Sequence, residues 1–126
     1  MKNTYFSILL FLILVGTLFF LNSKFIKLCN TVIEKCNVIE ELLNTDETEL
    51  SYNYSKDLLN LIIDEADVPA IYLNHLDYDV LKNDALKLTV YIKSDDKSES
   101  LATLHTLRST AEHLKELQSP NLKNIF

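Results

Sequence analysis

Three histidines are the side chains best suited to acid–base or metal chemistry. His75 and Asp79 are four residues apart, so on a helix they could meet on one face and share a proton or an ion. His105 and His113 would lie about 12 Å apart along a helix axis, which is too far for both to bind one ion. A helix cap or a surface hydrogen bond is the more ordinary role of a residue such as His75. The histidines alone therefore do not predict a catalytic or metal site.

Two cysteines, Cys29 and Cys36, are seven residues apart. On one helix their Cα atoms would be separated by about 10.5 Å, too far for a disulfide within that helix. Two isolated thiols at this spacing do not match a metal site either. We interpret them as small core residues, or as contacts between two copies of the helix.

The familiar motifs of catalysis are missing from the sequence. It contains no Gly-rich phosphate loop, no G-x-S-x-G, no C-x-x-C and no H-E-x-x-H. A di-iron site in a helical bundle would need repeated E-x-x-H pairs, and none occurs. We therefore predict that the protein is not an enzyme and uses no cofactor or metal.

Charge is distributed unevenly along the chain. Residues 40–84 contain twelve acids against Lys56 and Lys82, whereas the residues on either side are slightly basic. An acidic segment repels nucleic acid and would attract a basic partner surface or a cation, although it could also be an ordinary solvated helix face. The candidate interaction residues are Asp64, Glu65, Asp67, His75 and Asp79.

The first 23 residues have the composition of a membrane anchor. Tyr5 to Leu21 are uncharged, and a helix from Thr4 to Ser23 would span about 30 Å, one hydrocarbon core. Bulky residues stand where a signal peptidase needs small ones, so we expect an uncleaved signal-anchor rather than a removed signal peptide. The lysines on the two sides are nearly balanced. The short leader with one lysine resembles that of a signal-anchor, so we expect a single-pass cell-membrane protein whose body lies outside the cytoplasm.

Residues 24–126 are expected to form one helical domain. Apolar residues from Phe25 to Leu43 are spaced alternately four and three apart, a heptad stripe that would continue the membrane helix. Asp46 with Glu49, and Asp96 with Glu99, resemble capping boxes. We predict an all-α fold in which the transmembrane helix runs into an up-down bundle of about four helices. The expected helices lie near residues 24–43, 46–66, 69–93 and 98–118, with no internal repeat of fixed period.

Several short segments resemble a known family. They are Asn74–Asp79 (NHLDYD), Leu88–Ile92 (LTVYI), Glu99–Leu104 (ESLATL), Glu112–Leu114 (EHL) and Asn124–Phe126 (NIF). Over nearly its whole length, anchor included, the chain is similar to the domain-of-unknown-function family 4363, small single-anchor membrane proteins of spore-forming Gram-positive bacteria. The shared segments are helix-packing patterns, and the resemblance implies an accessory role beside a multi-pass membrane protein.

Two functions follow from the sequence. The first is a non-catalytic helical interaction protein, held in the lipid bilayer and bound to a membrane protein or to itself. The second is an extracytoplasmic sensor or binding module for a cation or a basic ligand. Nucleic acid is not an expected partner in either case.

Overall fold

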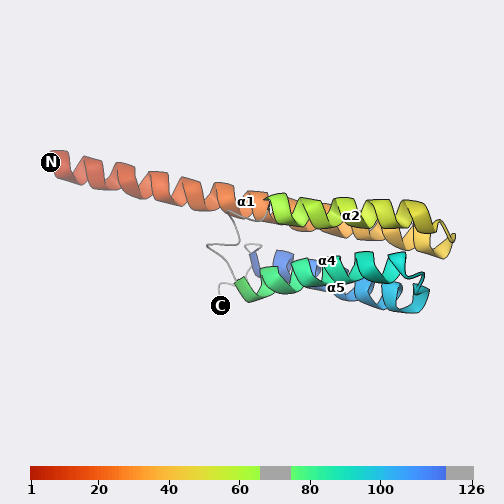
Figure 1. Ribbon diagram of the computed structural model, residues 1–126. Helices are drawn as coiled ribbons and strands as arrows, with labels where there is room; N and C mark the ends of the chain where they lie inside the picture. The colour runs from red at the N-terminus through yellow and green to blue at the C-terminus, as the bar shows by residue number, and fades with distance from the viewer. Residues whose placement is uncertain (66–74, 119–126) are drawn as a thin grey trace.

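The described part of the chain is helical, with short turns at residues 45–47 and 94–96. The computed structural model describes residues 1–65 and 75–118, and it describes residues 65, 75–77 and 118 without their side chains. The helices are α1 (Lys2–Asn44), α2 (Thr48–Glu65), α4 (His75–Lys93) and α5 (Lys97–Gln118) (Figure 1). The expected all-α fold is confirmed. The helix expected near 46–66 begins two residues later, and the one near 98–118 begins one residue earlier. The helix expected near 69–93 is described from His75 onward, because residues 66–74 lie outside the described part.

The four helices form an up-down bundle from which half of α1 projects. α1 packs against α2 and α5, and α4 packs against the same two helices, so α1 and α4 lie on a diagonal. The turns α1–α2 and α4–α5 lie at the same end of the bundle, while the N-terminal part of α1 extends away from the opposite end (Figure 1). A 43-residue helix is about 65 Å long, so α1 is long enough for both parts.

The heptad stripe of α1 faces the core of the bundle, as its spacing predicts. Val32, Cys36 and Ile39 are fully buried, and Phe25 and Leu43 mark the two ends of the packed part. Because the stripe is covered by the other helices, it is not available to pair two copies of α1. The large apolar residues between Tyr5 and Phe20 are instead exposed on all sides of the helix, and Val15 is half-buried.

Both cysteines are core residues. Cys29 packs with Phe25 and Leu114, and Cys36 lies in the main core cluster. Burial raises the pKa of the Cys29 thiol to about 11 and that of Cys36 to about 12. Since the thiolate is the reactive form, both thiols are protonated and unreactive near neutral pH.

The turn between α1 and α2 is a Schellman motif. The Asp46 N–H donates to the Leu43 carbonyl at 3.2 Å, and the Glu47 N–H donates to the Leu42 carbonyl at 2.9 Å. Asp46 has a φ of 60°, the left-handed conformation that this motif requires after the helix C-cap. The turn therefore satisfies carbonyls at the end of α1 without a glycine.

The turn between α4 and α5 repeats this arrangement. The Asp95 N–H donates to the Ile92 carbonyl and the Asp96 N–H to the Tyr91 carbonyl, both at 3.0 Å, and Asp95 has a φ of 58°. Each turn is followed by a serine, Ser51 or Ser100, whose buried hydroxyl donates to the carbonyl four residues earlier. The two turns are thus built from equivalent residues 49 positions apart.

Only one of the two expected capping boxes starts a helix in the expected way. Asp96 is a helix cap, because its carboxylate accepts a hydrogen bond from the Glu99 N–H at 3.1 Å. The assignment of Asp46 as the equivalent cap was wrong, because its left-handed φ places it at the end of α1. The residue equivalent to Asp96 is Glu47, whose carbonyl accepts the Ser51 N–H.

The same 49-residue spacing relates the buried positions of the two hairpins. Every core position from Val32 to Ile62 has a buried counterpart 49 residues later. The first hairpin contributes Val32, Cys36, Ile39, Leu43, Ser51, Ser55, Leu58 and Ile62; the second contributes Leu81, Ala85, Leu88, Ile92, Ser100, Leu104, Leu107 and Ala111. The expectation of no internal repeat was therefore wrong, and the bundle consists of two equivalent helical hairpins.

Substitutions at Asp95 test the left-handed turn. Asp95→Val should lower the free energy of unfolding by about 1–2 kcal/mol, because a β-branched residue strongly disfavours positive φ. Asp95→Gly should instead raise it by about 0.5 kcal/mol, because glycine adopts this conformation without strain. Urea unfolding of the full chain in detergent, followed by circular dichroism, measures both changes.

The same pair of substitutions at Asp46 is the matched control. Asp46→Val should again destabilise, but Asp46→Gly should gain less than Asp95→Gly, because it also removes the ion pair with Lys97. Equal stability of the Val and Gly variants at both positions would contradict the turn geometry.

Candidate functional site

The structure describes part of the acidic interaction site that the sequence predicts. Asp64, in the last turn of α2, and Asp79, near the start of α4, both have exposed side chains. The side chains of Glu65 and His75, and the whole of Asp67, lie outside the described residues. The pairing of His75 with Asp79 and the binding of a basic ligand therefore stay predictions.

Asp84, also in the acidic segment, is less exposed than Asp64 and Asp79. Its Oδ2 atom is buried without a hydrogen-bond partner among the described residues, and burial raises the pKa of its carboxyl, opposed by the nearby charge of Lys87. The carboxylates of this segment thus differ in environment and do not form one uniform solvated face.

The best-connected polar cluster lies elsewhere, across the seam between α1 and α5. Arg108 of α5 is ion-paired with Glu40 of α1 and donates to Asn37 Oδ1 at 2.8 Å. The Arg108 Nη2 atom also lies 2.7 Å from His105 Nδ1, and His105 Nε2 lies 3.8 Å from Glu40 Oε1. We call Asn37, Glu40, His105 and Arg108 the Arg108 cluster.

The geometry of the Arg108 cluster favours a structural role over an acid–base role. Glu40 and His105 could exchange a proton in principle, but Arg108 contacts both of them and holds the pKa of the Glu40 carboxyl below its usual range. A useful general base has a pKa near the working pH, which this guanidinium opposes. The cluster therefore fastens the first hairpin to the second.

Sequence reasoning missed this cluster because its partners are far apart in the chain. Arg108 and Glu40 are separated by 68 residues, so no local spacing connects them. The available signal was that Arg108 is the sole arginine of the chain and lies three residues after His105 on a helix.

Replacing Arg108 tests this role. Arg108→Gln should lower the free energy of unfolding at pH 7 by about 1–2 kcal/mol, since it removes charge-assisted hydrogen bonds from a partly buried carboxylate. Because Arg108 lowers the pKa of Glu40 in the folded state, the ionised Glu40 carboxylate stabilises the fold at pH values above its unfolded pKa. This stability is lost as the pH falls through the lower pKa of the folded state. Arg108→Gln should therefore lose less stability than the wild type on acidification. Urea unfolding at pH 7 and pH 3 gives both numbers.

Lys27→Gln is the control for the Arg108 experiment. Lys27 is exposed on α1, and its replacement makes the same change in net charge. It should alter stability by less than about 0.5 kcal/mol at either pH. Equal effects of the two substitutions would mean that net charge, and not the Arg108 cluster, is responsible.

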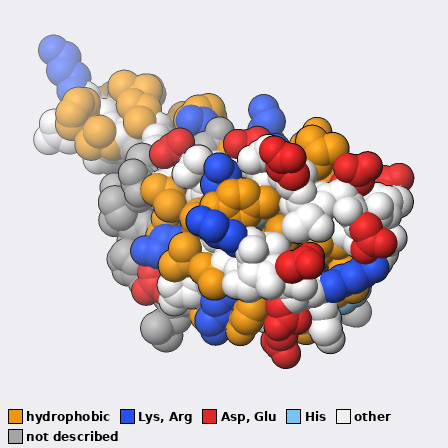
Figure 2. Space-filling model, turned by 45° about the vertical axis from the view of Figure 1, so that its right-hand side comes forward, with side chains coloured by type: hydrophobic (Ala, Val, Ile, Leu, Met, Phe, Trp, Pro, Cys, Tyr) orange, Lys and Arg blue, Asp and Glu red, His pale blue; other side chains and the backbone are white. Residues whose placement is uncertain are grey.

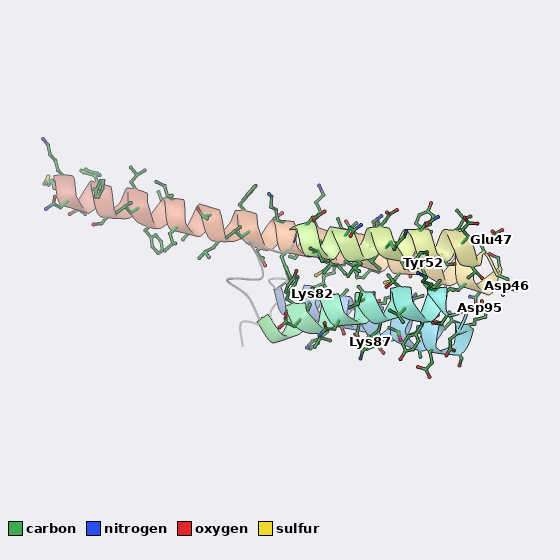
Figure 3. All side chains as sticks on the ribbon, in the orientation of Figure 1. Asp46, Glu47, Tyr52, Lys82, Lys87 and Asp95 are labelled. Atoms are coloured by element: carbon green, nitrogen blue, oxygen red, sulfur yellow. The ribbon has the colours of Figure 1, made fainter. Side chains whose placement is uncertain are left out.

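A shallow pocket lies between the two turns at the end of the bundle. It holds about 20 Å³, room for about one water molecule, and Asp46, Asp95, Asp96 and Lys97 are among its lining residues. The Lys97 ammonium lies 3.2 Å from an Asp46 carboxylate oxygen and so neutralises part of the acidic charge. Figure 3 shows Asp46, Glu47 and Asp95 together at this end. A pocket of this size cannot enclose an organic substrate.

Metal ligands do not converge in the described part of the chain. Among residues 1–65 and 75–118, no three His, Cys, Asp or Glu side chains are placed to hold an ion. The cation-binding alternative therefore gains no support from these residues.

One helix is long and apolar enough to cross a membrane. An 18-residue window within Lys2–Asn44 has a mean hydropathy of 2.4 and is not buried by the rest of the protein. A removed signal sequence would pass the same test, so this finding concerns only length and composition.

Comparison with known proteins yields a family match. The family model described as "Domain of unknown function (DUF4363)" matches residues 19–125. The match covers both hairpins but begins near the end of the apolar run, whereas the resemblance in the sequence implied that the anchor was included. Curated proteins and solved structures give no match.

Proposed function

The chain belongs to the DUF4363 family, whose description states no activity, and we propose that it is a membrane-anchored, non-catalytic protein that acts by binding a membrane protein through its helical bundle. The observation that carries this proposal is the division of α1. Its N-terminal half is apolar and exposed on every side, whereas its C-terminal half is part of the bundle core. Exposed apolar surface of this extent is unfavourable in water and is favourable in lipid.

The continuity of α1 supports a role in which the bundle is held at a fixed place beside the membrane. No break separates the apolar part from the bundle, so the bundle would stand on the membrane with its long axis following that of the span (Figure 1). This arrangement presents the sides of α2, α4 and α5 to neighbouring membrane proteins. A binding role also agrees with the chemistry of the described residues, in which the one His–Glu pair found is occupied by Arg108.

Copurification tests the proposed function. The full chain carrying a C-terminal tag is extracted from membranes with mild detergent after brief chemical crosslinking. We expect an integral membrane protein to copurify in near-stoichiometric amount. The matched control replaces residues 4–23 with an unrelated apolar helix and should retain the partner, because the bundle makes the contact. Recovery of the chain alone from both preparations would contradict the proposal.

We further propose that the bundle lies outside the cytoplasm, which rests on the signal-anchor character of the first residues. The buried native thiols make this testable, since they are protonated and covered. Ser94→Cys, in the exposed turn before α5, should be labelled by a membrane-impermeant maleimide in intact cells. The wild type, with its two buried cysteines, should stay unlabelled. Labelling of Ser94→Cys only after lysis would place the bundle in the cytoplasm.

A further inference from the structure

Side chains from α2 and α4 border the seam between these helices and continue onto the exposed outer side of α4. They are Tyr52, Lys56, Leu59 and Ile63 of α2, and Tyr78, Lys82, Leu86, Val90 and Lys93 of α4, which we call the α2/α4 face. Contacts cross the seam at both ends, because the Tyr78 hydroxyl is 3.5 Å from the Ile62 carbonyl and Lys93 Nζ is 5.9 Å from the Tyr52 ring centroid. The two helices are therefore in contact at both ends of the seam.

The α2/α4 face leaves large apolar side chains in contact with water. Ile63 is 41 % exposed, Leu86 52 % and Val90 55 %, although each belongs to a helix that also contributes to the core. Leu86 and Val90 are four residues apart and so form a continuous apolar strip on α4.

Lysines border this strip. Lys56 Nζ lies 4.7 Å from the Tyr52 ring centroid, and Lys82 Nζ lies 6.0 Å from that of Tyr78. Within the described part of the chain, Lys56, Lys82 and Lys93 form no ion pair. Figure 2 shows apolar and basic side chains intermixed over the middle of the visible face, and Figure 3 labels Tyr52 and Lys82 on neighbouring helices. The middle of the face is therefore apolar and cationic in a chain whose net charge is −6, with the exposed carboxylates of Glu49 and Asp79 at its two ends.

The equivalent seam of the molecule shows that the fold does not require this composition. Each residue of the Arg108 cluster has a counterpart 49 residues away in the α2–α4 region. The pairs are Asn37 and Leu86, Glu40 and Thr89, His105 and Lys56, and Arg108 and Leu59. On the α1/α5 seam, the side chains at these positions form hydrogen bonds and ion pairs with one another. At the equivalent positions of the α2/α4 face, Leu86 is exposed and Lys56 forms no ion pair within the described part of the chain.

From this difference we infer that the α2/α4 face is a docking surface for an acidic amphipathic helix of a partner protein. Three cationic side chains along an exposed apolar strip are complementary to a helix with carboxylates beside apolar residues. Tyr52 to Ile63 and Lys82 to Lys93 each extend over about 16 Å, which matches three turns of a helix. This inference rests on the proposed function and names the partner's chemistry.

A protein fits this face better than a lipid surface does. The face runs along the bundle axis, which continues the axis of the apolar part of α1 (Figure 1). Residues from Tyr52 to Ile63 would therefore lie at different heights above a membrane, and the face cannot lie flat on lipid headgroups. An extramembrane helix of a neighbouring membrane protein would run beside it.

Binding of a synthetic probe tests the inference. The probe is a fluorescent 14-residue helical peptide with leucines on one side and glutamates flanking them, offered to the full chain in nanodiscs of zwitterionic lipid. Binding is followed by fluorescence anisotropy at low salt. We expect the peptide to bind, and a version with lysines in place of the glutamates not to bind. Replacing all three lysines, Lys56, Lys82 and Lys93, by glutamine in one variant should weaken binding about tenfold. Each exposed ion pair with the peptide contributes only modestly to the affinity.

Two further variants keep the test specific. Replacing Lys27, Lys35 and Lys87 with Gln changes net charge equally and should leave the affinity within about twofold. Val90→Ser removes exposed apolar area without changing charge, so it should also weaken binding. Because Val90 is not part of the core, this variant should fold, and it tests the face even if the triple lysine variant does not fold.

Three outcomes would overturn the inference: equal losses in both lysine triples, equal binding of the acidic and basic peptides, or binding unaffected by Val90→Ser. Dimerisation of the chain that disappears in the Lys56, Lys82 and Lys93 variant would assign the face to a second copy instead. None of these results would touch the proposed function, whose own test is copurification from membranes.

Discussion

Removing residues 2–23 is expected to move the protein completely from the membrane fraction to the soluble fraction. The exposed apolar side chains from Tyr5 to Phe20 belong to this segment, and apolar residues such as Leu, Ile and Phe each favour the membrane by about 0.3–0.6 kcal/mol at the helix centre. Fractionation of cells followed by a carbonate wash measures the distribution. Because Phe25 and later residues form the packed core, the shortened chain should keep its bundle and its helical circular dichroism signal.

An unrelated apolar helix in place of residues 4–23 should restore the membrane location, because hydrophobic length and not sequence drives insertion. A shortened chain that still resists the carbonate wash would mean that another surface holds the protein. An intact mass corresponding to a mature form beginning near residue 24 would mean that the segment is a removed signal peptide.

Leu107→Ala is expected to lower the free energy of unfolding by about 2–5 kcal/mol, because it opens a cavity in a fully buried site. For a bundle of about 100 residues this lowers the midpoint of thermal unfolding by more than about 10 °C. Thermal unfolding of the full chain in detergent, followed by circular dichroism, measures the shift. Leu86→Ala, at a site that is 52 % exposed, is the control and should change stability by less than about 1 kcal/mol.

The equivalence of the two hairpins provides a second substitution for this experiment. Leu58 occupies the position of Leu107 in the first hairpin and is also fully buried, so Leu58→Ala should cost a similar amount. A severe loss at one of these positions and a negligible loss at the other would contradict the two-hairpin description of the core.

The main features of the fold could be predicted because they depend on local patterns. The stripe from Phe25 to Leu43 correctly gave the buried side of α1, since helical periodicity directly reports which residues share a face. The turn residues were harder to interpret. Asp46 and Asp96 both precede a glutamate by three positions, yet Asp46 ends a helix and Asp96 begins one. Spacing does not report φ, and the left-handed conformation of Asp46 depends on the hydrogen bonds of the whole turn.

The internal repeat was hidden because the two hairpins share burial at every core position but share residue type at only some of them. Cys36 corresponds to Ala85, and Ile62 corresponds to Ala111, so neither pair looks alike in the sequence. Both members of each pair are small or apolar enough to fill their place in the core. Only the hydrogen bonds of the turns and the burial pattern reveal the 49-residue spacing.

The candidate surfaces were beyond sequence reasoning for a different reason. Counting charge along the chain made Lys56 and Lys82 a minority within an acidic segment. The packing of α2 against α4 brings them onto one face with Lys93, which lies outside that segment. The Arg108 cluster likewise depends on α5 packing beside α1. Segment charge therefore predicted an acidic interaction site but could not predict where the basic side chains would gather.

The central claim is that the bundle binds a membrane protein through its α2/α4 face, and site-specific photocrosslinking tests it most directly. A photoreactive amino acid is placed at Val90, on the α2/α4 face, or at Glu41, its exposed counterpart on the α1 side. Irradiation of intact cells should give one discrete adduct from position 90, whose crosslinked peptide is an acidic amphipathic segment of an integral membrane protein, and none from position 41. The absence of an adduct from position 90, or the same adducts from both positions, would contradict the claim.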